Sequence, residues 1–118
     1  MLSFPSALRV YVSLDFCDMR KGYEGLSSLV ENSLKEDLRG GTLFVFTNRK
    51  RTRLKMIYFD GTGLWLLSKR LEQGTFSWPQ STDENCSKML LRPEALAMLT
   101  DGVDLKGAKL RPWYEREK

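Results

Sequence analysis

The run of residues 44–79 constrains the fold more than any other part of the sequence, because apolar segments alternate in it with turn-forming residues. Three segments are rich in β-branched and aromatic side chains, which favour strands: residues 42–47, 54–59 and 64–68. Asn48 follows the first segment and Asp60-Gly61-Thr62-Gly63 follows the second, and both are typical of turns. The pattern therefore predicts an antiparallel β-meander.

The segments on either side of this meander predict further strands. Residues 7–14 alternate apolar with polar side chains, as in a strand with one buried face. Residues 75–78 favour a fourth meander strand, which Pro79 ends because proline cannot donate to a ladder. Residues 86–91 favour another strand beyond a polar loop over residues 80–85.

Two helices are also expected, one long and one short. Apolar residues at helical spacing precede Gly40-Gly41, namely Leu26, Leu29, Val30, Leu34 and Leu38. Pro93 suits the first turn of the second helix, which Gly102 ends, and the residues expected to face inward are Ala95, Leu96 and Leu99. The expected fold class is α+β, a single domain over residues 1–118 in which the helices cover one face of an antiparallel sheet.

The composition fits one folded domain with no membrane segment. The chain has 118 residues, of which 42% are apolar and 29% charged. No apolar run approaches the roughly 20 residues that cross a bilayer, so a cytoplasmic location is expected. Cys17 and Cys86 lie far apart, which favours reduced, partly buried thiols over a disulfide. Residues 106–118 are basic and are expected to form a loosely packed tail.

Positive charge is concentrated in the meander. Seven of the 19 Lys and Arg residues lie between Arg49 and Arg70, where the only acid is Asp60. The formal net charge of the whole chain is +4, so the remainder is slightly acidic. Concentrated positive charge at the ends of strands is typical of a surface that meets polyanions.

The residues give little support to catalysis, and a non-enzymatic function is expected. The chain has no histidine, the commonest general base near neutral pH. Carboxylates could still hold metal ions for a nuclease, and the candidates are Asp15, Asp18, Asp60 and Glu72. Simpler interpretations make Asp60 a turn former, Asp18 a helix cap and Glu72 an ion-pair partner of Lys69. The glycines around Thr62 precede a strand pattern, so neither a phosphate loop nor a cofactor is expected.

Nucleic-acid contact is the function that the residues favour most. A basic hairpin tip can project several cations from a rigid ribbon toward phosphates. The candidate DNA-binding residues are Arg49, Lys50, Arg51, Arg53 and Lys55, with Lys69, Arg70, Arg20 and Lys21 as extensions. The alternative is that a basic tip only maintains solubility and blocks edge pairing.

Aromatic side chains could add base stacking to these contacts. The candidates are Tyr58, Phe59, Trp65, Phe76 and Trp78. In a small domain, however, aromatics on central strands more often fill the core. Within Tyr58-Phe59, the period of two sends one ring inward and the other outward, and the outward ring is the better candidate.

A series of motifs in this order resembles a known family. The motifs are Asp18-Met19-Arg20-Lys21-Gly22, Phe44-x-Phe46, Asn48-Arg49, Leu54-Lys55, Asp60 with Gly63, Lys69-Arg70-Leu71-Glu72 with Gly74, and Phe76-x-Trp78-Pro79. From the first strand to about Asp104, the chain resembles the small accessory protein of the IS sixty-six class of bacterial insertion sequences. This protein is often called TnpB or the second-open-reading-frame product, and it is unrelated to the RNA-guided nucleases that share the TnpB label.

The resemblance implies a part in DNA transposition beside a separate, larger transposase. It implies no reaction, because the family is known as required or helpful for transposition without an established activity. We therefore expect a non-enzymatic accessory factor that binds DNA through its basic hairpin. The alternative is a protein-interaction module that docks on the transposase, with Trp65 or Trp78 as an anchor. The oligomeric state is left open.

Overall fold

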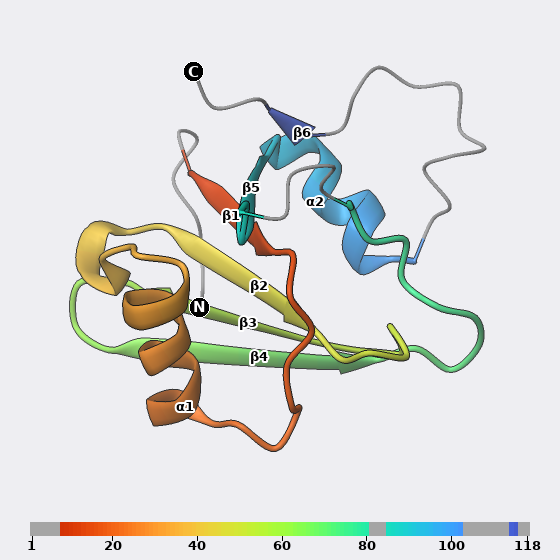
Figure 1. Cartoon of the computed structure of the whole chain (residues 1–118), viewed down its shortest axis with the longest axis horizontal. Helices are drawn as coiled ribbons and strands as arrows, with labels where there is room; N and C mark the ends of the chain where they lie inside the picture. The colour runs from red at the N-terminus through yellow and green to blue at the C-terminus, as the bar shows by residue number, and fades with distance from the viewer. Residues whose placement is uncertain (1–7, 81–84, 103–113, 116–118) are drawn as a thin grey trace.

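The computed structural model describes residues 8–80 and 85–102 and the backbone of residues 114–115. Its centre is a six-stranded sheet with the strand order β4-β3-β2-β1-β5-β6 (Figure 1). The strands are β1 (Val10–Ser13), β2 (Leu43–Thr47), β3 (Arg53–Phe59), β4 (Leu64–Arg70), β5 (Lys88–Leu91) and β6 (Tyr114–Glu115). β1 runs parallel to β2, while every other neighbouring pair is antiparallel. A parallel pair needs a long crossover, which the helical segment between β1 and β2 supplies.

The antiparallel meander that the sequence predicts is confirmed for β2, β3 and β4. The turn between β3 and β4 closes with Asp60 N donating to the carbonyl oxygen of Gly63 at 3.1 Å. Gly61 has a φ of +101° in this turn, a conformation that a side chain would strain. The expectation of a purely antiparallel sheet is wrong, because β1 joins β2 in parallel and makes the sheet mixed.

The two helices cover opposite faces of the sheet, not one face as expected. α1 (Tyr23–Ser28) packs with Phe44 and Phe46 on one face, and α2 (Pro93–Thr100) packs with Val12 and Val45 on the other. All residues of β1 and β2 are therefore buried, so the expectation of one buried face for the first strand is wrong. Strands that are apolar along their whole length are typical of sheets covered on both sides.

The apolar face of the predicted long helix is confirmed, but one continuous α-helix is wrong. α1 passes into the π-helix η1 (Leu29–Ser33), where Leu34 N donates to the carbonyl oxygen of Leu29 at 2.9 Å. Lys35 then has a φ of +56°, a left-handed conformation that ends the helix, and the 3-10 turn η2 (Leu38–Gly40) follows. The four residues directed into the core are Leu26, Val30, Leu34 and Leu38.

Residues 75–78 form no strand, because this segment leaves the sheet and packs on its α2 side. Phe76 is 0% exposed and Trp78 is 4% exposed. The indole Nε1 of Trp78 donates to the carbonyl oxygen of Ser13 at 2.8 Å, which satisfies its N–H inside the core. The predicted strand is therefore an irregular segment that closes the core beside α2.

Two further predicted elements, a strand and a helix, are confirmed, while a predicted loop and a predicted tail lie mostly outside the described residues. β5 lies within residues 86–91 as predicted, and α2 begins at Pro93 with Ala95 and Leu99 buried. The predicted loop over residues 80–85 and the predicted tail over residues 106–118 fall mostly outside the described residues. Within the second of these ranges, the backbone of β6 pairs with β5.

Two further expectations from the sequence concern the state of the cysteines and the presence of a membrane-spanning helix. Both cysteines are free, as expected, but only Cys17 is half-buried and Cys86 is exposed. In the described part of the chain, no helix is both long and apolar enough to cross a bilayer.

Candidate nucleic-acid interface

The β2–β3 loop, residues 48–52, holds its cations on a hydrogen-bonded frame. The side-chain Oδ1 of Asn48 accepts hydrogen bonds from the backbone N–H groups of Thr52 at 3.0 Å and Arg53 at 3.2 Å. The carbonyl oxygen of Asn48 also accepts from Arg51 N at 3.0 Å. Asn48 is favoured at such positions because its amide can replace backbone partners within a turn.

A second set of contacts ties this loop to the core. Leu71 N donates to the carbonyl oxygen of Thr52 at 3.0 Å, and Phe76 N donates to that of Arg51 at 2.7 Å. Because the Phe76 side chain is fully buried, its backbone is a fixed anchor. Arg51 has a φ of +57°, which residues other than glycine rarely adopt, and these hydrogen bonds hold it there.

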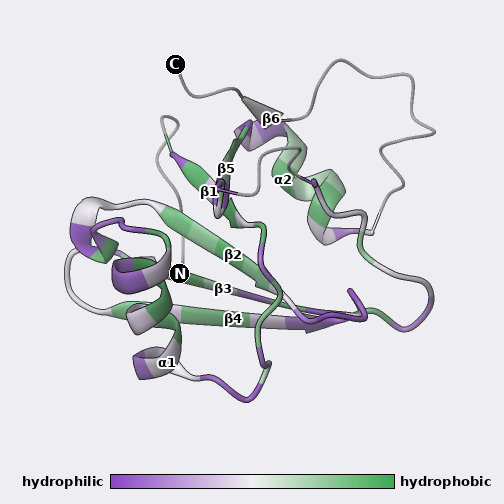
Figure 2. Cartoon of the chain, viewed as in Figure 1, coloured by the Kyte–Doolittle hydropathy of each residue, from purple (hydrophilic) through white to green (hydrophobic). Residues whose placement is uncertain are grey.

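Arg53 and Arg70 face each other directly across β3 and β4. Both are exposed, and within the described residues neither has an acidic group at salt-bridge distance. Strand alternation puts Arg53 on the α1 side with Ile57, and Figure 2 shows hydrophilic residues gathered at this end of β3 and β4 and in the β2–β3 loop. Like charges directly opposite each other destabilise a sheet by up to about 1 kcal/mol.

An anion held by both guanidinium groups would remove this repulsion, since arginine binds phosphate oxygens through paired N–H donors. Arg49 and Lys50 are exposed in the adjoining loop. We name Arg49, Lys50, Arg53 and Arg70 the basic cluster. Each is one of the residues that the sequence predicts to bind DNA.

Lys69, also predicted for this surface, lies on the opposite side of the sheet from Arg70. It pairs in register with Leu54, whose side chain belongs to the α2-side core. Its Nζ lies 3.7 Å from Oδ1 of Asp101, so the predicted ion pair with Glu72 is wrong. Lys69 is therefore outside the basic cluster.

Residues 14–22, which we name the crossing segment, run from the end of β1 across β2, β3 and β4 to the start of α1 (Figure 1). Cys17 N donates to the carbonyl oxygen of Thr47 at 3.0 Å and fixes the first half of the segment on β2. Lys55 Nζ donates to the carbonyl oxygen of Lys21 at 2.9 Å and fixes the second half on β3. Lys55 and Lys21 thus hold the crossing segment on the sheet.

Arg20 lies in the crossing segment and is already paired. Its guanidinium donates to both carboxylate oxygens of Asp18, with the shortest distance at 2.7 Å. These hydrogen bonds lower the pKa of Asp18 to about 2. Asp18 also accepts from Arg20 N at 2.9 Å and does not cap α1, whose N-cap is Gly22, so the predicted helix cap is wrong.

Asp60 forms the turn that the simpler interpretation of the sequence expects. Its Oδ1 accepts from Thr62 N at 2.8 Å, from Thr62 Oγ1 at 2.8 Å and from Gly63 N at 3.0 Å. Its Oδ2 accepts from Trp65 Nε1 at 2.8 Å. Led by the Thr62 N–H and the Trp65 indole, these donors hold the pKa of Asp60 well below its ordinary value of 3.8.

Asp60→Asn is expected to lower the free energy of unfolding at neutral pH, because the amide loses the charge that these donors stabilise. A carboxyl group whose pKa is lower in the folded than in the unfolded protein stabilises the fold at pH values above its unfolded-state pKa. This stabilisation is lost as the pH falls from there through the folded-state pKa. The difference between wild type and Asp60→Asn should therefore shrink below the ordinary value of 3.8. Urea unfolding of both proteins at neutral and acidic pH measures it. A difference that stays constant between neutral and acidic pH would contradict the assignment.

The carboxylates considered for a metal-dependent nuclease do not converge. Asp18 lies near the start of β3 and Asp60 follows its end, about 20 Å away along the strand. Among the residues that the structure describes, no three His, Cys, Asp or Glu side chains are grouped so that they could hold a metal ion.

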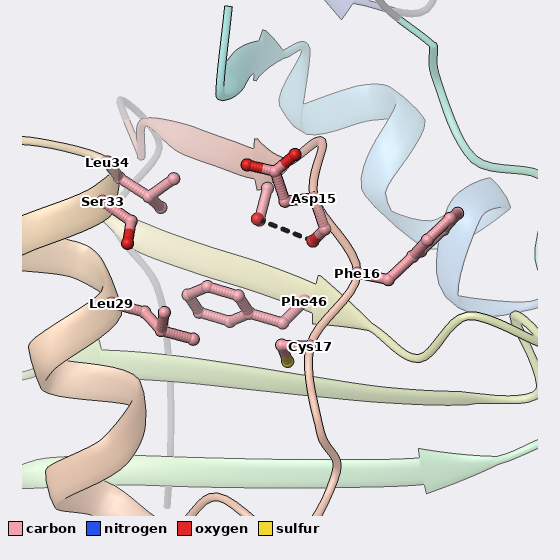
Figure 3. A pocket seen from close by; sticks show the side chains of 8 residues that line it. Asp15, Phe16, Cys17, Leu29, Ser33, Leu34 and Phe46 are labelled. Atoms are coloured by element: carbon pink, nitrogen blue, oxygen red, sulfur yellow. Dashed lines mark hydrogen bonds between the residues drawn. The ribbon is translucent and has the colours of Figure 1, made fainter.

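A small hollow lies between the crossing segment and η1, with a volume of about 50 Å³. Cys17, Leu29 and Phe46 line it, and the ring of Phe16 points away from it (Figure 3). Burial raises the pKa of the Cys17 thiol, so it stays protonated at neutral pH. Since sites for small molecules usually enclose roughly 300–1,000 Å³, the hollow has room only for a few water molecules.

Comparison with known proteins places the chain in a family. The profile of the family described as "IS66 Orf2 like protein" matches residues 8–110. The chain belongs to the IS66 Orf2-like family. Two similar proteins come from Sinorhizobium fredii (strain NBRC 101917 / NGR234). "Uncharacterized protein y4jC" is 35% identical over 112 residues, which cover 95% of this chain and 93% of that protein. "Uncharacterized protein y4hO" is 36% identical over 104 residues, which cover 88% of each. No solved structure matches.

Members of the IS66 Orf2-like family are accessory proteins of insertion-sequence transposition and are not known as catalytic enzymes. The resemblance to this family in the sequence motifs is thereby confirmed. The match assigns no role to single residues, so the interface rests on the geometry of the basic cluster and the crossing segment.

In this IS66 Orf2-like protein, most of the aromatic candidates are buried, as expected for aromatics on the central strands of a small domain. Tyr58, Phe76 and Trp78 are buried, and half-buried Phe59 lies beneath the guanidinium of Arg39, at 5.7 Å. Neither ring of Tyr58-Phe59 is therefore free on the outside, and only Trp65 of the candidates is exposed. The other large exposed apolar side chains described are Phe16 and Tyr23. For Phe16, the available signal was its place in a polar segment between predicted elements, where no strand or helix pattern buries it.

Proposed function

We propose that this protein is a DNA-binding accessory factor of transposition, in which the basic cluster contacts the phosphate backbone. The observation that supports the proposal most is the direct pairing of Arg53 with Arg70. Two exposed arginines at one cross-strand position weaken the free sheet, and a bound phosphate converts the repulsion into shared attraction. The family's place in DNA transposition makes a nucleic acid the natural source of that phosphate.

The rigidity of the loop supports the same proposal. Asn48 and the backbone of Phe76 hold the loop in one conformation, so Arg49 and Lys50 lose less conformational freedom when they bind. A basic tip that served only solubility needs no such frame. Phosphate contacts of this kind position a protein on DNA without reading its sequence.

Arg53→Gln/Arg70→Gln is the direct test. Each phosphate contact contributes about 0.9 to the slope of log affinity against log salt, so the double variant, which loses the one phosphate shared by Arg53 and Arg70, should lose about 0.9 from that slope. Fluorescence anisotropy with labelled DNA of the element ends across a salt series measures both affinity and slope. The matched control Arg39→Gln/Arg92→Gln removes two exposed cations away from the cluster and should bind as wild type does. Equal slopes for wild type and Arg53→Gln/Arg70→Gln would contradict the proposal.

One observation favours a second candidate function, docking on the element's transposase. Trp65 is 40% exposed on the edge strand β4, and its indole is oriented by Asp60. Exposed tryptophans are frequent anchors of protein interfaces. Trp78, the other candidate anchor, is buried and cannot serve. Co-purification with the transposase after nuclease digestion, lost in Trp65→Ala, would support docking. Loss of the complex on digestion of wild type would leave DNA as the link.

A further inference from the structure

Two exposed aromatic rings border the crossing segment. Phe16 is 43% exposed near its start, and Tyr23 is 50% exposed where α1 begins directly after it. Trp65, the third large exposed apolar side chain of the described residues, follows the turn at the opposite end of β3. Of the three, Phe16 lies on the segment that crosses the sheet beside the basic cluster, and Tyr23 directly follows that segment.

Phe16 is directly joined to the basic cluster. The guanidinium carbon of Arg49 lies 5.7 Å from the centroid of the Phe16 ring, a cation–π contact. The backbone on both sides of Phe16 is fixed, because Ser13 Oγ donates to the carbonyl oxygen of Asp15 at 3.1 Å and Cys17 N donates to β2. Figure 3 shows the ring directed away from the hollow.

Tyr23 begins α1 directly after the other end of the segment. Two residues before it, the carbonyl oxygen of Lys21 accepts the ammonium of Lys55, which shares one face of β3 with Arg53. The carbonyl oxygen of Tyr23 accepts from Ser27 Oγ at 2.6 Å, while its ring is half-exposed. Phe16 thus lies against Arg49 near one end of the crossing segment, and Tyr23 follows the other end, which Lys55 holds on β3.

This combination points to one form of DNA. Cations alone bind the phosphates of duplex and single strands alike, but the faces of bases in a duplex are already stacked on one another. Aromatic rings beside a basic track add binding only where bases are unpaired, and they do so without regard to sequence. We infer that this surface binds single-stranded DNA, with its phosphates on Arg53 and Arg70 and its bases stacked on Phe16 and Tyr23. The inference rests on the proposed DNA-binding function and specifies the DNA that is bound.

The test compares a labelled single strand of about 20 nucleotides, longer than one expected site, with the duplex of the same sequence. Wild type should bind the single strand at least about tenfold more tightly, since each stacked base contributes about tenfold. Phe16→Ala/Tyr23→Ala should lose about 100-fold for the single strand and keep its duplex affinity and salt slope. Phe16→Tyr/Tyr23→Phe should restore the single-strand affinity, and Trp65→Ala, which removes a ring away from the cluster, should leave it unchanged.

The outcomes separate this inference from the proposed function. Equal binding of single strand and duplex, with neither affected by Phe16→Ala/Tyr23→Ala, would overturn the inference and leave the basic cluster as a general DNA contact. Binding to the single strand that depends on Arg53 and Arg70 but not on the two rings would also overturn it. If wild type bound neither DNA, the proposed function itself would fail.

Discussion

Phe76→Ala is expected to lower the free energy of unfolding by about 3–5 kcal/mol, because the side chain is fully buried and the cavity cannot fill completely. Domains of this size are stable by only about 5–15 kcal/mol, so the melting temperature should fall by roughly 10–20 °C. The effect reaches the loop as well, since Phe76 N donates to the carbonyl oxygen of Arg51. Thermal and urea unfolding, followed by circular dichroism, measure the loss.

The matched control for Phe76→Ala is Tyr23→Ala, which removes an aromatic ring that is half-exposed. Surface substitutions of this kind usually change stability by less than about 0.5 kcal/mol. If Phe76→Ala were no more destabilising than Tyr23→Ala, the irregular segment over residues 75–78 would not be the core element that the structure describes.

Replacement of all four residues of the basic cluster by glutamine should have the largest effect on binding. The loss of three phosphate contacts, one of them shared by Arg53 and Arg70, reduces the salt slope by about 2.7 and weakens binding about 100-fold or more at low salt. Arg51 is left unchanged because its positive φ and its backbone contacts make its substitution a test of folding. Anisotropy across a salt series measures slope and affinity together.

The outcome that would contradict this prediction is a small, salt-independent change. Arg39→Gln/Arg92→Gln serves as the control again, because a general charge effect would weaken that variant as well. A loss confined to the four-residue variant assigns the effect to the cluster and not to net charge.

Much of this interface could be predicted from the sequence. The alternation of apolar segments with turn residues gave the correct order for β2, β3 and β4. The turn of four residues after Phe59 then fixes the register, and it follows that Arg53 lies opposite Arg70. The same alternation implies that Lys69 lies on the other side of the sheet from Arg70. The expectation that both residues belong to one basic surface did not take this into account.

The remaining features depend on contacts that a local pattern does not contain. The parallel pairing of β1 with β2 is decided by which strand the crossover returns to, and the apolar run of either strand fits both directions. Residues 75–78 resemble a strand in composition, but burial of Phe76 and Trp78 against α2 competes with pairing and wins. The π-helix also leaves no mark in the spacing of apolar residues, because Val30 and Leu34 would lie on one face of a regular α-helix as well.

Near the candidate site, the expectations differ from the structure where single side chains bind local partners. Asp18 binds Arg20 two residues away, whereas a helix cap was the simpler expectation. Phe16 lies in a segment with no periodic pattern, so only the path of the crossing segment over the sheet brings its ring to Arg49. Such positions follow from tertiary structure and not from propensity.

The measurement that tests the central claim most directly is thermal unfolding of wild type and Arg53→Gln/Arg70→Gln at low salt, with and without DNA. Without DNA, the variant should be at least as stable as wild type, because about 0.2–1 kcal/mol of like-charge repulsion is removed. With DNA at about 100 times the dissociation constant, wild type should gain about 2.7 kcal/mol and become the more stable protein, while the variant gains little. A variant that is less stable alone, and that DNA stabilises as much as it does wild type, would contradict the claim that this arginine pair is a phosphate-binding element.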